Sequence, residues 1–163
     1  MVLFLAGCVG IPENITPVGN FQLVKYLGKW YEIARLDHSF ERGLTKVTAE
    51  YSLKDGGGVN VLNRGYSVKK NKWKEAKGKA YFVKESNVGY LKVSFFSPFY
   101  GSYIVFELDH ENYQYAVVSG PDKSYLWILA RSPKIPEELK NTLVAKAAGL
   151  GFDTGKLVFV EQE

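Results

Sequence analysis

The chain has 163 residues, which suggests a single domain, and its 46% hydrophobic and 23% charged residues are typical of a folded globular protein. Cys8 is the only cysteine, which excludes an intrachain disulfide and a cysteine-based zinc site, and no apolar run reaches the roughly 18–20 residues of a membrane-spanning helix. Lys and Arg outnumber Asp and Glu by 21 to 17, and no dense basic stretch indicates a nucleic-acid groove.

The first residues carry a pattern that predicts lipid attachment. A short apolar run at 2–6 leads into Leu5-Ala6-Gly7-Cys8, which resembles the bacterial lipobox, whose cysteine sulfur receives a diacylglyceryl group. We therefore expect residues 1–7 to be a signal-peptide remnant and Cys8 to be acylated. The usual positively charged start is missing, so a disordered apolar tail is the alternative. Val9, where inner-membrane lipoproteins often have Asp, points by the same resemblance to the outer membrane.

Residues 8–19 are expected to be the lipidated cysteine and a tether, because Pro12, Pro17 and Gly19 interrupt a stretch with little apolar periodicity. From residue 30 to 131 the dominant period is two, as in strands with one buried and one solvated face. The alternation predicts eight strands, most of them joined by hairpin turns such as the one at 55–58. Such a meander closes most economically as an antiparallel up-and-down β-barrel.

The polar face of the early strands carries Lys and Glu, so we expect an apolar interior and a solvated outside rather than a transmembrane barrel, whose faces are reversed. The later strands are apolar on both faces and need a cover. A helix over about 136–148 supplies it, with Glu137 and Glu138 in its first turn and an apolar stripe through Leu143 and Ala147. Residues 157–160 predict a short final strand. The fold class is all-β, with the barrel domain over 20–163.

Three motifs in this order resemble the conserved regions of lipocalins, in the apolipoprotein D-like branch. They are Gly28-Lys29-Trp30, Leu108-Asp109-His110-Glu111-Asn112-Tyr113 and Trp127-Ile128-Leu129-Ala130-Arg131. The stretches at 37–43 and 95–101 resemble bacterial outer-membrane lipocalins in particular. The resemblance implies that Trp30 closes one barrel end under the Arg131 guanidinium, that Gly28 keeps the approach open and that Asp109 shapes a turn. These are structural roles rather than ligand contacts.

The resemblance also implies a small hydrophobic ligand inside the barrel. We expect the ligand to contact the residues whose place in the apolar–polar alternation points into the barrel. Some are small and leave space, and others are aromatic and form flat walls. They are Ala34, Ala49, Tyr51, Val61, Asn63, Ala76, Phe82, Val93, Phe95, Tyr103, Val105, Glu107, Tyr125 and Trp127. Buried polar groups are costly unless they are paired or hydrated. Glu32, Glu107 and Asn63 therefore predict either a headgroup anchor or a structural hydrogen-bond cluster, and a filled barrel remains the alternative to a pocket.

The resulting hypothesis is a membrane-anchored protein that stores or transports fatty acids or (lyso)phospholipids at the bacterial envelope, with its barrel facing the periplasm. The alternatives are a structural or interaction lipoprotein with a filled barrel, and a lipocalin enzyme acting on lipids. We expect no enzyme, because the only thiol lies upstream of the barrel. No cofactor, metal or nucleic acid is indicated. The densest basic run is interpreted as a solvated strand face and turn; it comprises Lys69, Lys70, Lys72, Lys74, Lys77 and Lys79.

Overall fold

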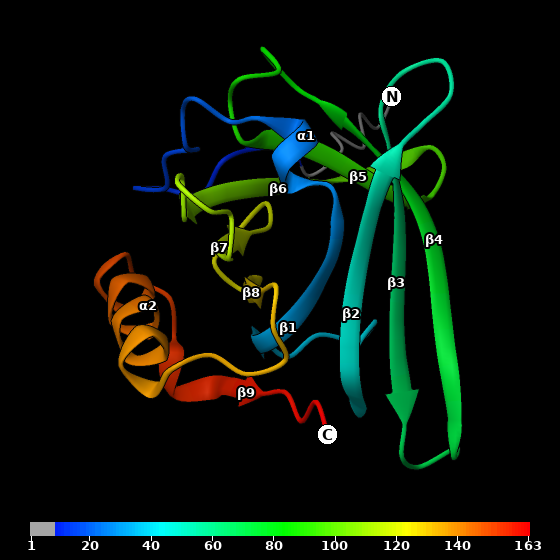
Figure 1. Cartoon of the computed structure of the whole chain (residues 1–163), viewed down its shortest axis with the longest axis vertical. Helices are drawn as coiled ribbons and strands as arrows, with labels where there is room; N and C mark the ends of the chain where they lie inside the picture. The colour runs from blue at the N-terminus through cyan, green and yellow to red at the C-terminus, as the bar shows by residue number, and fades with distance from the viewer. Residues whose placement is uncertain (1–8) are drawn as a thin grey trace, which may run out of the picture.

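The computed structural model describes residues 9–163, and the strands of its barrel follow one another in chain order (Figure 1). These strands are β1 (Gly28–Leu36), β2 (Leu44–Leu53), β3 (Val59–Ser67), β4 (Lys72–Phe82), β5 (Tyr90–Phe96), β6 (Phe99–Leu108), β7 (Tyr115–Ser119) and β8 (Leu126–Ala130). They are preceded by α1 (Leu23–Tyr26) and followed by α2 (Glu137–Gly149), the short 3-10 helix η1 (Thr154–Lys156) and β9 (Leu157–Phe159).

The sheet closes into a barrel. Each strand from β2 to β8 pairs antiparallel with the next, and β1 pairs with β8 on one side and with β2 on the other. Closure is incomplete at one end, because β1 pairs with β2 only through residues 28–31 and β4 pairs with β5 only through residues 79–82. Strands β2, β3 and β4 therefore project as a long wall (Figure 1). The predicted all-β, eight-stranded up-and-down barrel is confirmed.

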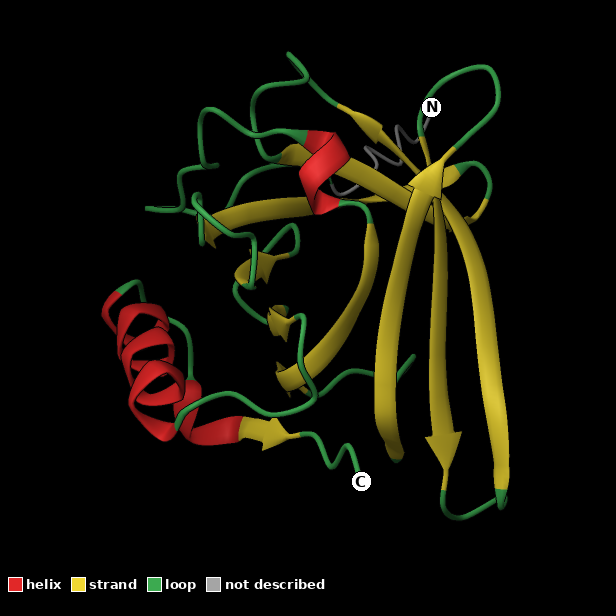
Figure 2. Cartoon of the chain, viewed as in Figure 1, coloured by secondary structure: helices red, strands yellow, loops and turns green. Residues whose placement is uncertain are grey.

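The barrel has a closed end and an open end. β1 starts beside α1, and the buried side chains of Phe21 and Tyr26 fill this closed end. Because strand direction alternates, the β2–β3, β4–β5 and β6–β7 connections share the closed end with α1. The β1–β2, β3–β4, β5–β6 and β7–β8 connections leave the opposite ends of their strands, which form the open end. The β3–β4 hairpin reaches farthest from α1, whereas the β5–β6 hairpin lies near the upper part of the β2–β4 wall (Figure 2).

Helix α2 packs outside the barrel, as predicted, and ends one residue later than expected. Leu143 and Ala147 are buried against an outer cluster that includes Ile128 and Phe152, and this helix covers the outward face of the last strands. This explains why those strands are apolar on both faces. The predicted final strand is confirmed as β9, which pairs with the second half of β1. No helix in the described part of the chain is long and apolar enough to cross a membrane.

Two β-bulges correct two of the predicted inward positions. In β1 the register with β8 shifts between Glu32 and Ala34, so Ala34 packs in the outer cluster and Arg35 points inward instead. In β6 the register with β7 shifts just before Glu107, whose carboxylate faces α2 and lies 2.9 Å from Lys146 Nζ. A bulge adds one residue to one strand and reverses the faces of all residues beyond it, so strict alternation fails there.

Where a tether was predicted, residues 9–19 lie against the barrel. The Tyr90 hydroxyl donates to the carbonyl of Val9, and Ser102 Oγ donates to the carbonyl of Gly10. Farther along, the amide of Val18 bonds the carbonyl of Val105 at 2.8 Å. This segment therefore extends the packed domain toward the N-terminus. The expected signal-peptide remnant at 1–7 and the acylation site Cys8 lie outside the described residues.

Candidate functional site

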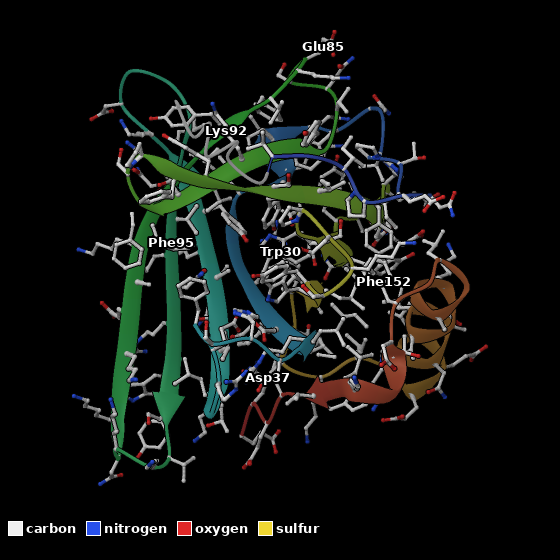
Figure 3. The ribbon with its side chains drawn as sticks, turned by 180° about the vertical axis from the view of Figure 1, so that it is seen from behind. Trp30, Asp37, Glu85, Lys92, Phe95 and Phe152 are labelled. Atoms are coloured by element: carbon white, nitrogen blue, oxygen red, sulfur yellow. The ribbon has the colours of Figure 1, made fainter. Side chains whose placement is uncertain are left out.

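The closed end is built around Trp30, which lies fully buried inside the barrel (Figure 3). The guanidinium of Arg131 stacks on the Trp30 ring, with its carbon 3.9 Å from the ring centroid. The same guanidinium donates to the carbonyls of Lys25, Lys29, Leu27 and Tyr113 at 2.8–3.2 Å. One side chain thus ties α1, β1 and the β6–β7 connection across the barrel end.

Two further motif residues, Gly28 and Asp109, lie at the same end of the barrel. Gly28 has φ +99°, a backbone conformation that strains other residues, so glycine relieves backbone strain where the chain passes the Arg131 guanidinium. The carboxylate of Asp109 accepts hydrogen bonds from the amides of Asn112 and Gln114, which fixes the β6–β7 turn. Gly28, Trp30, Asp109 and Arg131 thus all contribute to the structure of the closed end.

Above Trp30, three tyrosine hydroxyls form a chain. Tyr103 Oη lies 2.6 Å from Tyr26 Oη and 2.8 Å from Tyr51 Oη. Burial raises the pKa of each phenol, so all three remain protonated at neutral pH. A cavity of about 10 Å³ lies beside them, roughly the space of one water molecule. The closed half of the barrel is therefore almost filled.

Toward the open end, the inward side chains are only half-buried. Twelve of the fourteen predicted contacts line the interior or its mouth: Ala49, Tyr51, Val61, Asn63, Ala76, Phe82, Val93, Phe95, Tyr103, Val105, Tyr125 and Trp127. Ala76 faces inward yet is exposed, because β4 has no β5 partner there. The Phe95 ring lies against Gly78, where any Cβ would come within 2.8 Å of it. The accessible inner wall is apolar and aromatic.

A charged cluster occupies the interior beside this wall. Arg35 is 2% exposed, and its guanidinium lies 3.2 Å from Glu32 Oε1 and 3.8 Å from Glu41 Oε2. It also donates to the backbone carbonyls of Glu41 and Leu44, at 2.9 Å and 3.3 Å, and to the carboxylate of Asp37 at 3.4 Å. Arg35 therefore holds the β1–β2 loop against the barrel from inside.

The same loop is fastened through Glu41. Its Oε1 accepts a hydrogen bond from Trp127 Nε1 at 3.0 Å and lies 2.9 Å from His38 Nε2. The His38 ring packs against the Trp127 ring, with centroids 5.5 Å apart. Arg42, by contrast, is solvated and pairs with Asp37 at 3.0 Å. The β1–β2 loop is thus a lid that buried charges and an aromatic wall hold in place.

The two carboxyls of the cluster ionise in opposite directions. Burial raises the pKa of Glu32 well above its ordinary value, and the neighbouring Glu41 carboxylate raises it further, more than Arg35 lowers it. Burial also acts to raise the pKa of Glu41, but hydrogen bonds, chiefly from His38, outweigh it and lower that pKa to about 2. Glu41 is therefore the carboxylate that balances Arg35 at neutral pH.

Sequence reasoning missed several residues of the interior. Arg35 was not predicted to point inward, because the β1 bulge reverses which residues face the interior. No local sequence signal marks a bulge in this stretch. Phe21 and Tyr26 were not predicted to lie in the interior, because they precede the first strand. The turn of α1 places their side chains inside the barrel. Glu32 was expected to need a partner, and Arg35 is that partner. No group of three or more His, Cys, Asp or Glu side chains within residues 9–163 is arranged to hold a metal ion.

Relatives of known name agree with this architecture. The outer membrane lipoprotein Blc of Vibrio cholerae is 59% identical over 161 residues, which cover 99% of this chain and 94% of that protein. The Escherichia coli K12 protein of the same name is 54% identical over 93% of this chain and 85% of its own length. Apolipoprotein D of Mus musculus is 34% identical, over 88% of this chain and 78% of that protein. The two Blc lipoproteins confirm the predicted outer-membrane location.

Solved structures show the same fold. The cockroach allergen Per a 4 superimposes with a TM-score of 0.71 at 20% identity, covering 93% of this chain and 95% of that one. Insecticyanin of Manduca sexta also reaches 0.71 at 20% identity, covering 93% and 86%. A family model described as a lipocalin-like domain matches residues 21–162. The chain therefore belongs to the lipocalin family, within which it groups with bacterial outer-membrane lipoproteins.

Proposed function

We propose that this lipocalin binds the acyl chain of a fatty acid or lysophospholipid along its open inner wall and stores or carries that lipid at the outer membrane. The observation that carries the proposal is the half-buried apolar surface on the mouth side of the interior, formed by residues such as Ala49, Val93, Phe95 and Trp127. Apolar surface of this kind gains free energy when an acyl chain covers it. The 10 Å³ cavity beyond it limits how deeply a chain enters without rearrangement.

The polar end of the lipid belongs at the open end in this proposal. Asn63 is half-buried there between Ala49 and Ala76. In the described part of the chain, His38 Nδ1 and Glu41 Oε2 are buried without a hydrogen-bond partner. Buried polar atoms without partners are costly, so a polar headgroup that reached them would relieve an unfavourable state. Acylated Cys8 would hold the protein at the membrane, with the barrel on the periplasmic side.

A filled barrel is the second candidate, and the nearly filled closed half favours it. The protein would then act through its anchor and surface rather than through a ligand. A lipocalin enzyme is a third candidate with less support, because residues 9–163 contain no cysteine that could serve as a thiol nucleophile. Titration with a lipid distinguishes the first two candidates directly.

The test is titration of delipidated full-length Cys8→Ser protein with oleate and with an oleoyl lysophospholipid, followed by tryptophan fluorescence and calorimetry. We expect saturable binding in the micromolar range or tighter. Ala49→Phe, which fills the inner wall, is expected to weaken binding about tenfold or more, or roughly 1.4 kcal/mol. Glu50→Phe is the matched control, because Glu50 is the next residue on β2 and faces outward.

Folded protein that binds neither lipid saturably would favour the filled barrel. Equal weakening by Ala49→Phe and Glu50→Phe would place the bound lipid outside the interior. Either result would reject the proposed site.

A further inference from the structure

The β3–β4 hairpin tip, residues 68–74, is an exposed basic and aromatic surface that lipid binding in the interior does not use. All seven of its residues are exposed, including Lys69, Lys70, Lys72 and Lys74. Val68 is 64% exposed and Trp73 is 43% exposed. Apolar, aromatic and cationic residues therefore share one turn, and this turn projects from the rest of the barrel in Figure 1.

The tip is held in a defined conformation. β3 and β4 pair without interruption from Val59–Ala80 to Ser67–Lys72. The Tyr66 and Trp73 rings meet edge to face with centroids 5.4 Å apart, and the guanidinium of Arg64 stacks 4.0 Å from the Trp73 ring. Such support limits the entropy lost when the tip engages a surface.

The charge of the tip has a single sign. The sequence contains no Asp or Glu from residue 56 to residue 74. None of the four tip lysines forms an ion pair with any residue of the described chain, and the adjacent Glu75 is paired with Arg64 at 3.4 Å. The closed-end connections differ, because each of them contains an acid: Asp55 beside Lys54, Glu85 beside Lys84, and Asp109 with Glu111 in the third.

Exposed aromatic side chains are distributed with the same asymmetry. Phe40 in the β1–β2 loop is 71% exposed and Trp73 in the β3–β4 hairpin is 43% exposed, and both connections lie on the side of the barrel away from α1 (Figure 1). In the described chain, the exposed large apolar side chains of the closed-end helix and connections are aliphatic, such as Val24 and Val83. Tryptophan and other aromatic rings favour the headgroup region of a bilayer, and lysines favour its anionic phosphates.

We propose that the open end, led by the β3–β4 hairpin tip, docks on an anionic phospholipid surface. The contact is noncovalent and independent of acylation at Cys8. A second copy of the chain is a poorer occupant, because two tips facing each other would oppose four unpaired lysines with four more. Docking through this end would turn the mouth of the barrel toward the bilayer.

The experiment measures vesicle binding by full-length Cys8→Ser protein, which has no covalent anchor. Vesicles of phosphatidylglycerol and phosphatidylethanolamine are compared with vesicles of phosphatidylcholine alone. The tip variant changes Lys69, Lys70, Lys72 and Lys74 to Gln. The matched control changes four closed-end lysines, Lys25, Lys29, Lys54 and Lys84, to Gln, so that both proteins lose the same net charge.

We expect binding to the anionic vesicles only, weakened about tenfold or more by the tip variant and less than about twofold by the control. In the unmodified tip, Trp73 is also expected to be quenched by brominated lipid, with Trp73→Phe supplying the background from Trp30 and Trp127. This second readout does not depend on how well the lysine variants fold.

Three outcomes would overturn the proposal. The first is that the parent protein does not bind anionic vesicles. The second is equal weakening by the tip variant and the closed-end control, which would show a response to net charge alone. The third is a change of oligomeric state in the tip variant without loss of vesicle binding, which would make a second copy the occupant.

Discussion

Among individual residues, Glu41 links electrostatics to the position of the β1–β2 lid. Its carboxylate balances the buried Arg35 of β1, accepts a hydrogen bond from Trp127 of β8 and contacts His38 in its own loop. Its pKa of about 2, against 4.5 for an ordinary Glu, means that the folded state strongly favours the ionised form. Folding stability therefore depends on the ionisation of this side chain.

We predict that Glu41→Gln makes the free energy of unfolding depend less on pH between about 4.5 and 2. The stabilisation from Glu41 is complete above its unfolded pKa near 4.5 and is lost as the pH falls toward 2, because the unfolded state then binds the proton more readily. The wild type should lose on the order of 2–3 kcal/mol over this range through Glu41. Urea unfolding at pH 2.5, 4 and 6 would show it, and parallel profiles for the wild type and the variant would contradict it.

Glu32→Gln is the matched control for that experiment. The raised pKa of Glu32 has the opposite sign, since the folded state holds the proton more tightly than the unfolded state. Its contribution is present below the unfolded pKa and declines as the pH rises through the folded value. Glu32→Gln should therefore keep the wild-type loss of stability below pH 4.5. The two variants then distinguish the contribution of Glu41 from that of Glu32.

Among the elements, α2 illustrates stability without a role in ligand binding. It covers the outward face of the last strands, and its Leu143 is 2% exposed in the outer cluster. The interior wall is formed by the opposite face of the same strands. Packing of the helix and occupancy of the interior are therefore separable properties.

We predict that Leu143→Ala lowers the free energy of unfolding by about 3 kcal/mol, through lost burial and the cavity left behind. Acyl-ligand affinity should stay within about twofold of the wild type, because the change lies outside the barrel. Thr142→Ala, at the exposed neighbouring position, should change stability by less than about 0.5 kcal/mol. Calorimetric unfolding and lipid titration measure the two effects, and a large loss of affinity would link the helix to the site.

For the whole molecule, the C-terminal segment closes the gap where β1 and β2 diverge. The Val160 amide bonds the Ile33 carbonyl at 2.9 Å, and the Lys46 amide bonds the Glu161 carbonyl at 2.6 Å. Gln162 Nε2 donates to the carbonyls of Glu32 and Val47 at 2.7 Å and 2.9 Å, which join both strands. The barrel wall is therefore completed by the last residues of the chain.

We predict that Gln162→Ala lowers the free energy of unfolding by about 1–2 kcal/mol, because two buried carbonyls lose their donor. Gln162→Glu should cost at least as much, since a carboxylate of the same shape accepts hydrogen bonds and cannot donate to either carbonyl. Chemical denaturation of both variants tests this. A Gln162→Glu protein as stable as the wild type would show that the junction of β1, β2 and the C-terminal segment depends on packing rather than on these two hydrogen bonds.

Much of this architecture could be predicted, because its signals are local. Alternation of apolar and polar residues predicts the strands of the barrel, and the stripe through Leu143 and Ala147 predicts the outer helix. The stacking of Arg131 on Trp30 was implied by the resemblance of their motifs to those of lipocalins, and in the structure the two side chains stack. Most inward positions followed from parity within regular strands. Whether the wall binds lipid stays a prediction.

The sequence by itself determined the fold class, the order of the strands and which face of each regular strand is buried, since period and turn chemistry are properties of short segments. Only the tertiary structure decided where the register slips, and so that Ala34 and Glu107 face outward while Arg35 lies inside. Only the tertiary structure showed that the β1–β2 loop folds onto Arg35 and that Gln162 bridges β1 and β2 where they diverge. These features depend on pairing between distant segments, whose geometry no local pattern encodes.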